Sequence, residues 1–220
     1  MRRLRFYVDY ISSNAYLAWL VLPRLVAKYD VEIEPVPVLF AGLLEAHGQL
    51  GPAEVPAKVL WMWKNNLRKA AHLGAPLNRP AYHPFNPLLA LRASSLPMDE
   101  DRRRVFTEGL LKAVWVRELH VSEPDVVATI ASEAGLDGAA IVAEATTPEA
   151  KARLRSQTDA AIAAGVFGVP TMEVGGELFW GYDDFPQLEM LLAGKDPLDP
   201  EEVRRWSGPP RPSSVRRQFR

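Results

Sequence analysis

The stretch LRFYVDY, residues Leu4–Tyr10, alternates roughly with period two and is rich in aromatic side chains, so it predicts a β-strand. A polar break at Ser12–Asn14 separates it from Ala15–Ala27, whose apolar residues recur at helical spacing. These residues predict a helix that Pro23 should kink. Residues Val31–Val38 predict a second strand, and its two prolines indicate that not all of its N–H groups join a ladder. The chain therefore opens with a right-handed βαβ unit.

The end of the chain returns to strands after a long helical segment. From about residue 41 to residue 164 nearly every segment shows helical spacing. Residues Pro170–Val174 and Glu177–Trp180 predict a β-hairpin around the turn signal Gly175-Gly176, and a last helix should end near Gly194. This order predicts an α/β protein with a thioredoxin-like fold split by a large all-helical insertion. The expected parts are a thioredoxin-like domain (residues 1–40 and 160–194), a helical insertion domain (41–159) and a C-terminal tail (195–220).

Sequence signals predict where two helices of the insertion begin. One is expected to begin near Pro56, and Leu60, Trp63, Leu67 and Ala71 mark one of its faces. Another should begin after Thr147, where a capping residue is followed by proline in the first turn.

The composition excludes several classes of chemistry. The 220 residues include no cysteine, which excludes disulfides, thiolate metal sites and a cysteine nucleophile. The net charge of −1 provides no basic field for nucleic acid, and no stretch is apolar for long enough to span a membrane. Neither a serine-hydrolase elbow nor a metal-ligand spacing is present. His47, His72, His83 and His120 lie far apart in the sequence and in no spacing typical of a metal site. A cytoplasmic location is expected.

The polar break after the first strand is the first candidate site. Ser12, Ser13 and Asn14 stand at the carboxyl end of a strand and at the N-terminus of a helix. Ligands gather at such strand ends, and helix N-termini stabilise anions. A serine hydroxyl at this point can donate a hydrogen bond to a thiolate and lower the pKa of a bound thiol. The alternative is that one of the three residues only caps the helix.

Two further stretches near the C-terminus are candidates. The Val169-Pro170 bond is a plausible cis site, which would turn the Val169 backbone toward an extended ligand; the alternative is an ordinary strand-initiating proline. Tyr182 and Asp183 stand at the start of the last helix, where Asp183 either caps the helix or binds an ammonium group. Lys58, with Gln49 in the preceding loop, is a fourth candidate, although a lone lysine on a helix is usually solvated.

Together these stretches resemble the family of 2-hydroxychromene-2-carboxylate isomerases and kappa-class glutathione transferases, which is related to the disulfide oxidoreductase DsbA. The resemblance covers about residues 4–193. It rests on the order and spacing of FYVD (6–9) with Ser12 and YLA (16–18), FGVPT (167–171), and LFWG (178–181) with Asp183.

The resemblance implies glutathione as cofactor, a small aromatic or conjugated substrate and a homodimer. Ser12 would take the place of the family's catalytic serine, which contacts the glutathione sulfur. Val169 would pair through its backbone with the cysteinyl part, and Asp183, with Tyr182 beside it, would hold the γ-glutamyl end. The implied reaction is glutathione-assisted isomerisation, in which the thiolate adds to a conjugated carbon, a bond rotates and the thiolate leaves.

Several positions match the family less closely. Lys58 falls where the family has a lysine that reaches the glycyl carboxylate, whereas Gln49 stands where asparagine is frequent. Asn14 and Pro170 would shape the site. Ser13 replaces a common proline, so Ser13 could share or take over the role of Ser12. The alternatives are a kappa-class-like transferase acting on another electrophile, an enzyme that uses another small thiol, and a non-catalytic thioredoxin-fold binding protein.

Overall fold

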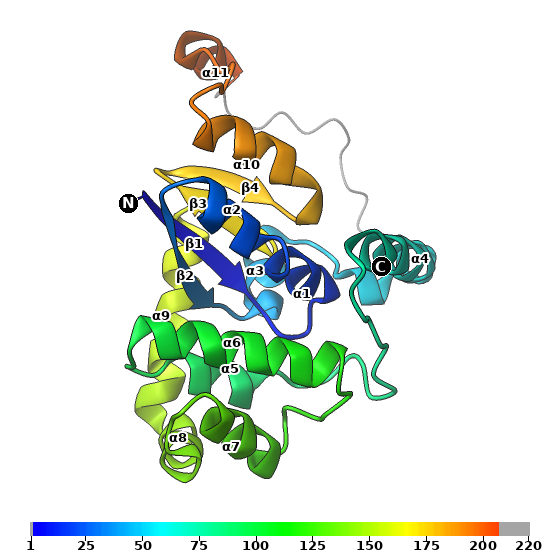
Figure 1. Cartoon of the computed structure of the whole chain (residues 1–220), viewed down its shortest axis with the longest axis vertical. Coiled ribbons are helices and arrows are strands. Elements are labelled where there is room, and N and C mark those ends of the chain that lie inside the picture. The colour runs from blue at the N-terminus through cyan, green and yellow to red at the C-terminus, as the bar shows by residue number, and fades with distance from the viewer. Residues whose placement is uncertain (1, 207–220) are drawn as a thin grey trace, which may run out of the picture.

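The computed structural model describes residues 2–206, whose centre is a four-stranded sheet in the order β2-β1-β3-β4 (Figure 1). β1 (Arg2–Val8) pairs in parallel with β2 (Val31–Pro37) and antiparallel with β3 (Thr171–Val174). β3 pairs antiparallel with β4 (Glu177–Trp180). The predicted strands are confirmed. Because β1 and β3 run in opposite directions, the end of β1 lies beside the start of β3.

Local sequence explains the edge strand and the hairpin. β2 lies at one edge of the sheet, which is where a strand tolerates residues such as Pro35 and Pro37 that cannot donate to a ladder. The hairpin turn uses Gly175 and Gly176, with φ of 63° and 94°. Such left-handed angles favour glycine because a Cβ would be strained there.

The first helix differs from its prediction. Two helices, α1 (Ser13–Trp19) and α2 (Leu22–Lys28), replace the single kinked helix expected over Ala15–Ala27. Pro23 lies in the first turn of α2, where its missing N–H costs no helical hydrogen bond. Proline therefore starts a new helix here instead of bending a continuous one.

The helical segment lies between β2 and β3, which confirms the split α/β thioredoxin fold. Its helices are α3 (Phe40–His47), α4 (Pro56–Leu73), α5 (Leu88–Ser95), α6 (Glu100–Trp115), α7 (Pro124–Glu133), α8 (Gly138–Ala145) and α9 (Pro148–Ala163), with a 3-10 turn, η1 (Pro52–Glu54), before α4. Thr147 caps α9 as predicted, since its hydroxyl accepts from the Ala150 N–H. The proposed domain boundaries stay a prediction.

The chain after the hairpin is also helical. The 3-10 turn η2 (Tyr182–Asp184) precedes α10 (Phe185–Leu192) and α11 (Pro200–Trp206). Helix α11 falls within the predicted tail, and its side chains are exposed. The rest of that tail lies outside the described residues. Among residues 2–206 no helix has the length and apolarity that a membrane span requires.

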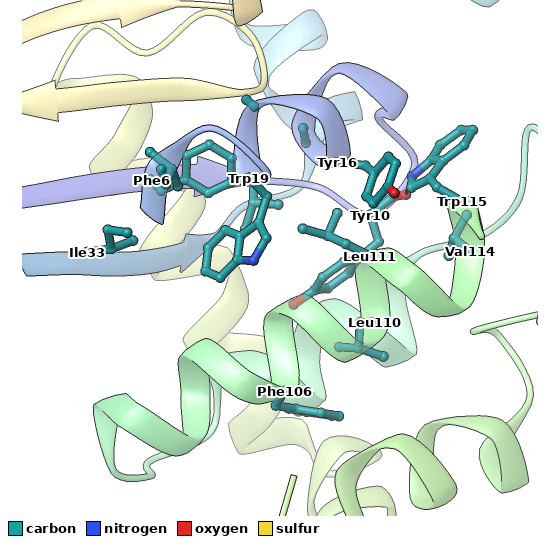
Figure 2. Packing of buried hydrophobic residues seen from close by; sticks show 14 of the residues in the cluster. Phe6, Tyr10, Tyr16, Trp19, Ile33, Phe106, Leu110, Leu111, Val114 and Trp115 are labelled. Atoms are coloured by element: carbon teal, nitrogen blue, oxygen red, sulfur yellow. Dashed lines mark hydrogen bonds between the residues drawn. The ribbon is translucent and has the colours of Figure 1, made fainter. Parts of the chain in front are cut away.

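One hydrophobic core joins the sheet to the inserted helices. Figure 2 shows Phe6 of β1 beside Trp19 of α1, with ring centroids 5.5 Å apart, and Tyr10 above Leu111 of α6. Trp115, at the end of α6, is fully buried and donates from Nε1 to the Tyr10 carbonyl at 3.0 Å. Each such buried side chain contributes about 1.5–3 kcal/mol. The insertion is thereby fixed to the chain two residues before Ser12.

Helix α4 begins at Pro56 as predicted, but it buries only part of the face that the apolar spacing marks. Its buried residues are Trp63, Asn66 and Ala70, whereas Leu60 and Leu67 are exposed. Apolar spacing alone therefore does not identify the buried face of α4. The face that meets α1 instead includes the polar Asn66, which α1 supplies with a hydrogen-bond partner.

Candidate active site

A tight turn places Ser12 at the N-terminus of α1. The Ser12 N–H donates to the Asp9 carbonyl at 3.1 Å, and the Ser12 hydroxyl oxygen accepts from the Ala15 N–H at 3.2 Å. The same hydroxyl lies 3.5 Å from the Val169 carbonyl oxygen, to which it donates. Ser12 is therefore a helix cap, and its partly exposed hydroxyl also faces the segment that leads into β3.

Ser13 has no such access. Its side chain is 3 % exposed, and its hydroxyl accepts from Asn66 Nδ2 of α4 at 2.7 Å. Asn66 is fully buried. Of the two serines that the sequence left open, Ser13 ties α1 to α4 and Ser12 faces outward.

The Val169-Pro170 peptide bond is cis, in agreement with the predicted candidate. The Val169 carbonyl accepts from Ser12, while within residues 2–206 the Val169 N–H has no hydrogen-bond partner. The Gly181 N–H donates to the Pro170 carbonyl at 2.8 Å. That hydrogen bond fixes the start of η2 beside the Val169 segment, so Ser12, Val169 and η2 are joined.

Asp183 belongs to η2 and does not cap α10. Its Oδ2 accepts from Lys69 Nζ of α4 at 2.7 Å, and the same ammonium lies 3.5 Å from Asn14 Oδ1. It also lies 4.9 Å from the centre of the Tyr182 ring. Burial raises the pKa of Tyr182, and the Asp183 carboxylate raises it further, so the phenol stays protonated at neutral pH. The structure therefore brings Asn14, Tyr182 and Asp183 together around Lys69.

Lys58 and Gln49 lie apart from this cluster. Lys58 is exposed in the first turn of α4, and Gln49 is exposed just after α3. In the described part of the chain neither side chain forms a hydrogen bond or ion pair with Ser12, Val169 or Asp183. Their predicted roles stay predictions.

His83 connects the inserted helices to the serine turn. Its Nε2 lies 3.1 Å from the Ile11 carbonyl, a contact that requires the ring to carry its proton on that nitrogen. Its ring centroid is 5.7 Å from that of Trp63. Burial lowers the pKa of His83 below its usual value, the hydrogen bond to Ile11 opposes this shift, and the nearby Arg79 adds to it, so the neutral imidazole is favoured at pH 7. A neutral donor thus holds the residue before Ser12.

Beyond Trp63, one side of α4 and the following loop form a groove of about 350 Å³. Its wall is mostly apolar, and its lining residues are Pro56, Val59, Leu60, Trp63, Leu67, Leu77 and Arg79. The Arg79 guanidinium lies 5.2 Å from the Trp63 ring centre. Among residues 2–206 no carboxylate pairs with Arg79. The groove therefore combines an apolar wall with an unpaired cation.

A larger cavity, of about 410 Å³, lies elsewhere. It is lined in part by Arg5, Glu34, Arg103 and Arg153, and none of the predicted site residues reaches it. This cavity is therefore separate from the residues that the sequence predicts for the site.

Asp9 is a buried acid directly before the serine turn. Its two carboxylate oxygens accept from the Ile11 N–H at 3.1 Å and from the Phe40 N–H at 2.9 Å. The side chain is 1 % exposed. Burial raises the pKa of Asp9 to about 7, although these backbone hydrogen bonds lower it. Asp9 thus joins the serine turn to the start of α3.

Sequence reasoning missed Asp9, Asn66, Lys69, His83 and Arg79. Asp9 lies within the stretch that carries the family resemblance, but nothing in the local sequence indicates that its carboxyl is buried. Asn66 and Lys69 lie three residues apart on α4 beside the buried Trp63, which is a polar interruption of a buried face. That interruption was the one available signal, since a buried polar group requires a partner.

The comparisons with known proteins agree with this fold. Residues 3–193 match the DSBA-like thioredoxin domain. A 2-hydroxychromene-2-carboxylate isomerase from Pseudomonas putida is 32 % identical over 190 residues, covering 85 % of this chain and 92 % of that protein. Human glutathione S-transferase kappa 1 is 25 % identical, with 94 % of each chain covered.

A solved structure of a 2-hydroxychromene-2-carboxylate isomerase aligns with a TM-score of 0.81 and 26 % identity. The alignment covers 94 % of this chain and all of that one. The chain belongs to the DsbA-like thioredoxin family, within which it is a homologue of the 2-hydroxychromene-2-carboxylate isomerases and kappa-class glutathione transferases.

Proposed function

We propose that this protein is a glutathione-dependent isomerase of the 2-hydroxychromene-2-carboxylate isomerase type, in which Ser12 stabilises the glutathione thiolate. One observation carries the proposal. In a chain without cysteine, the Ser12 hydroxyl stands at the N-terminus of α1 and against the Val169 carbonyl. A donor and a helix N-terminus at one point suit a thiolate that the ligand supplies. The named activity of the relatives supports the same reaction.

The residues around Ser12 suit glutathione as the source of sulfur. The Val169 N–H is without a partner in residues 2–206, so it can donate to the cysteinyl carbonyl of an extended peptide. The Asp183 carboxylate is exposed and suits the γ-glutamyl end. Lys58, exposed in the first turn of α4, suits the glycyl carboxylate.

In the proposed mechanism the protein orients glutathione and stabilises the negative charge on its sulfur. When bound, glutathione supplies the thiolate that adds reversibly to the conjugated carbon of the substrate, so that the bond to be rotated loses its double-bond character. The Ser12 hydroxyl turns its proton from Val169 toward the sulfur and stabilises its negative charge. His83 and Asp9 act as positioning residues, because they hold Ile11 through its carbonyl and its N–H.

The groove along α4 suits the electrophile. Trp63 and Leu77 provide an apolar wall for an aromatic ring, and the unpaired Arg79 provides a cation for a carboxylate. Trp63 also contacts His83, which holds Ile11, so this wall continues to the residue beside Ser12. The proposed substrate is therefore a conjugated aromatic acid.

Two measurements test the proposed function. Glutathione should bind at millimolar concentration or below, as followed by intrinsic tryptophan fluorescence or calorimetry. The protein with glutathione should then interconvert 2-hydroxychromene-2-carboxylate and its ring-opened trans-benzylidenepyruvate isomer, as followed by absorbance. Absence of glutathione binding contradicts the proposal. Binding without isomerisation, but with conjugation of other electrophiles, would instead support the transferase alternative.

Arg79→Leu is expected to raise KM for a carboxylate-bearing substrate by about 10–100-fold, since a charge-assisted hydrogen bond contributes about 1.5–3 kcal/mol. Glutathione affinity should stay unchanged, and the methyl ester of the substrate should be used equally well by mutant and wild type. Arg68→Leu, at an exposed position of α4, is the matched control. An equal loss for acid and ester would contradict the role of Arg79 in carboxylate binding.

Homodimerisation stays an expectation from the family resemblance, and a cytoplasmic location stays a prediction from the sequence. Size-exclusion chromatography with light scattering measures the first.

A further inference from the structure

Lys69 is the most enclosed ammonium group beside the candidate site. Its side chain is 10 % exposed, although Lys69 lies on a helix whose other lysines are exposed. Its Nζ contacts three groups from two elements, namely Asp183 Oδ2 and the Tyr182 ring of η2 and Asn14 Oδ1 of α1. Enclosing a lysine costs solvation free energy and side-chain entropy. Either a large contribution to the stability of the fold or a functional role must therefore account for the position of Lys69.

The structural gain is small. The Asp183 side chain is 73 % exposed, and an ion pair with one solvated partner contributes roughly 0–1 kcal/mol. The Asn14 contact is long, at 3.5 Å. A stability role alone therefore accounts poorly for the position of Lys69.

The pair also changes what Asp183 can do. Oδ2 of Asp183 is used by Lys69, and within residues 2–206 Oδ1 has no hydrogen-bond partner. One carboxylate oxygen of Asp183 is therefore available to a ligand, and it lies beside the positively charged ammonium of Lys69. That combination is a poor match for an isolated ligand cation, whereas it complements a ligand that carries a cation and an anion on adjacent atoms.

We propose that Lys69 is a specificity-determining residue that binds the α-carboxylate of the γ-glutamyl group of glutathione, while Asp183 binds its α-ammonium. This inference rests on the proposed function. The γ-glutamyl end has both charges on one carbon, which is the pattern that the Lys69–Asp183 pair complements. Asn14, two residues after Ser12, limits the ammonium to positions near the helix N-terminus. The Gly181–Pro170 hydrogen bond holds η2 beside the Val169 segment that would bind the cysteinyl part.

Two glutathione analogues separate the charges. Glutaryl-cysteinylglycine keeps the α-carboxylate position and lacks the ammonium, and 4-aminobutanoyl-cysteinylglycine keeps the ammonium and lacks the carboxylate. Dissociation constants of glutathione and both analogues would be measured by calorimetry for the wild type, Lys69→Met, Lys69→Arg and Lys64→Met. Lys64 is an exposed lysine of the same helix, so its variant controls for loss of net charge.

Lys69→Met should weaken binding of glutathione and of the glutaryl analogue by about 10–100-fold, the range for loss of a charge-assisted hydrogen bond. Binding of the aminobutanoyl analogue should be unchanged or tighter, since Asp183 would then keep both oxygens for the ligand. Lys69→Arg should restore most of the loss, and Lys64→Met should match the wild type.

Equal weakening of all three ligands, or none, by Lys69→Met would overturn the assignment and leave Lys69 a structural residue. Thermal unfolding of each variant without ligand shows whether weaker binding comes from a destabilised fold. Lys69→Arg is the second control, because it keeps the positive charge that Lys69→Met removes. If the wild type does not bind glutathione, the proposed function fails and this inference fails with it. If the wild type binds but the analogues are not discriminated, the proposed function stands.

Discussion

Ser12→Ala is expected to lower kcat for glutathione-dependent isomerisation by about 10²–10³-fold, the usual cost of removing one hydrogen-bond donor from a developing anion. The physical reason is that the sulfur keeps the N-terminus of α1 but loses the hydroxyl that now donates to Val169. The pKa of the bound thiol should rise, because the donor favours the thiolate. Ultraviolet titration of the thiolate in the complex, mutant against wild type, measures that rise.

The control for Ser12→Ala must reproduce the loss of a helix cap. Thr147→Ala does so, since the Thr147 hydroxyl accepts from the Ala150 N–H at 3.2 Å, the same distance as in the Ser12 cap. Both variants should lose about 1 kcal/mol of stability. Thr147→Ala should keep its turnover and its thiol titration. If Ser12→Ala retained wild-type kcat and an unshifted thiol pKa, the assignment of Ser12 would be wrong. A loss confined to Ser13→Ala would transfer the role to Ser13.

Asp9→Asn is expected to change how stability depends on pH. The pKa of Asp9 is raised from 3.8 to about 7 in the folded protein, so between these values the folded state holds a proton that the unfolded chain releases. The free energy of unfolding of the wild type therefore falls as the pH rises through this range. The fall contributed by Asp9 is on the order of 4 kcal/mol, at about 1.4 kcal/mol per pKa unit.

Asparagine has the same shape and does not titrate, so Asp9→Asn should lose that dependence. Urea unfolding of both proteins at about pH 3 and about pH 8, beyond each end of the window, gives the difference between them. Relative to the wild type, the variant should gain stability as the pH rises. Subtraction cancels titrations that both proteins share, including that of His83. Parallel pH profiles for the two proteins would contradict a raised pKa for Asp9.

The sheet follows from local sequence because its signals are local. Alternation in Leu4–Tyr10, proline at an edge strand and paired glycines in a hairpin each act within a few residues. The same holds for Ser12 and for the Val169-Pro170 bond, which lie in short recognisable stretches. The split between α1 and α2 was missed because Pro23 is compatible both with a kink and with a first helical turn.

The polar partners of the site do not follow from local sequence. Lys69 meets Asp183 across 114 residues of chain, and Asn66 meets Ser13 across 53. The polar interruption on α4 indicates that partners are needed, but which distant element supplies them depends on how the helices pack. The buried face of α4 has the same origin: Leu60 and Leu67 carry the apolar signal, whereas a buried position belongs to Asn66, whose Nδ2 donates to Ser13 of another helix.

The two faces of α4 have a consequence for how specificity can diversify. The inner face, with Asn66 bonded to Ser13, fixes the frame of the serine turn, and the outer face, with Leu60 and Leu67, lines the groove. Because exposed lining residues tolerate exchange at little cost in stability, substitutions there can alter the accepted electrophile without moving Ser12. The inner face of α4 thus carries residues that must be kept to hold the serine turn, and its outer face carries residues that can be exchanged. We expect homologues with different substrates to differ first along the outer face.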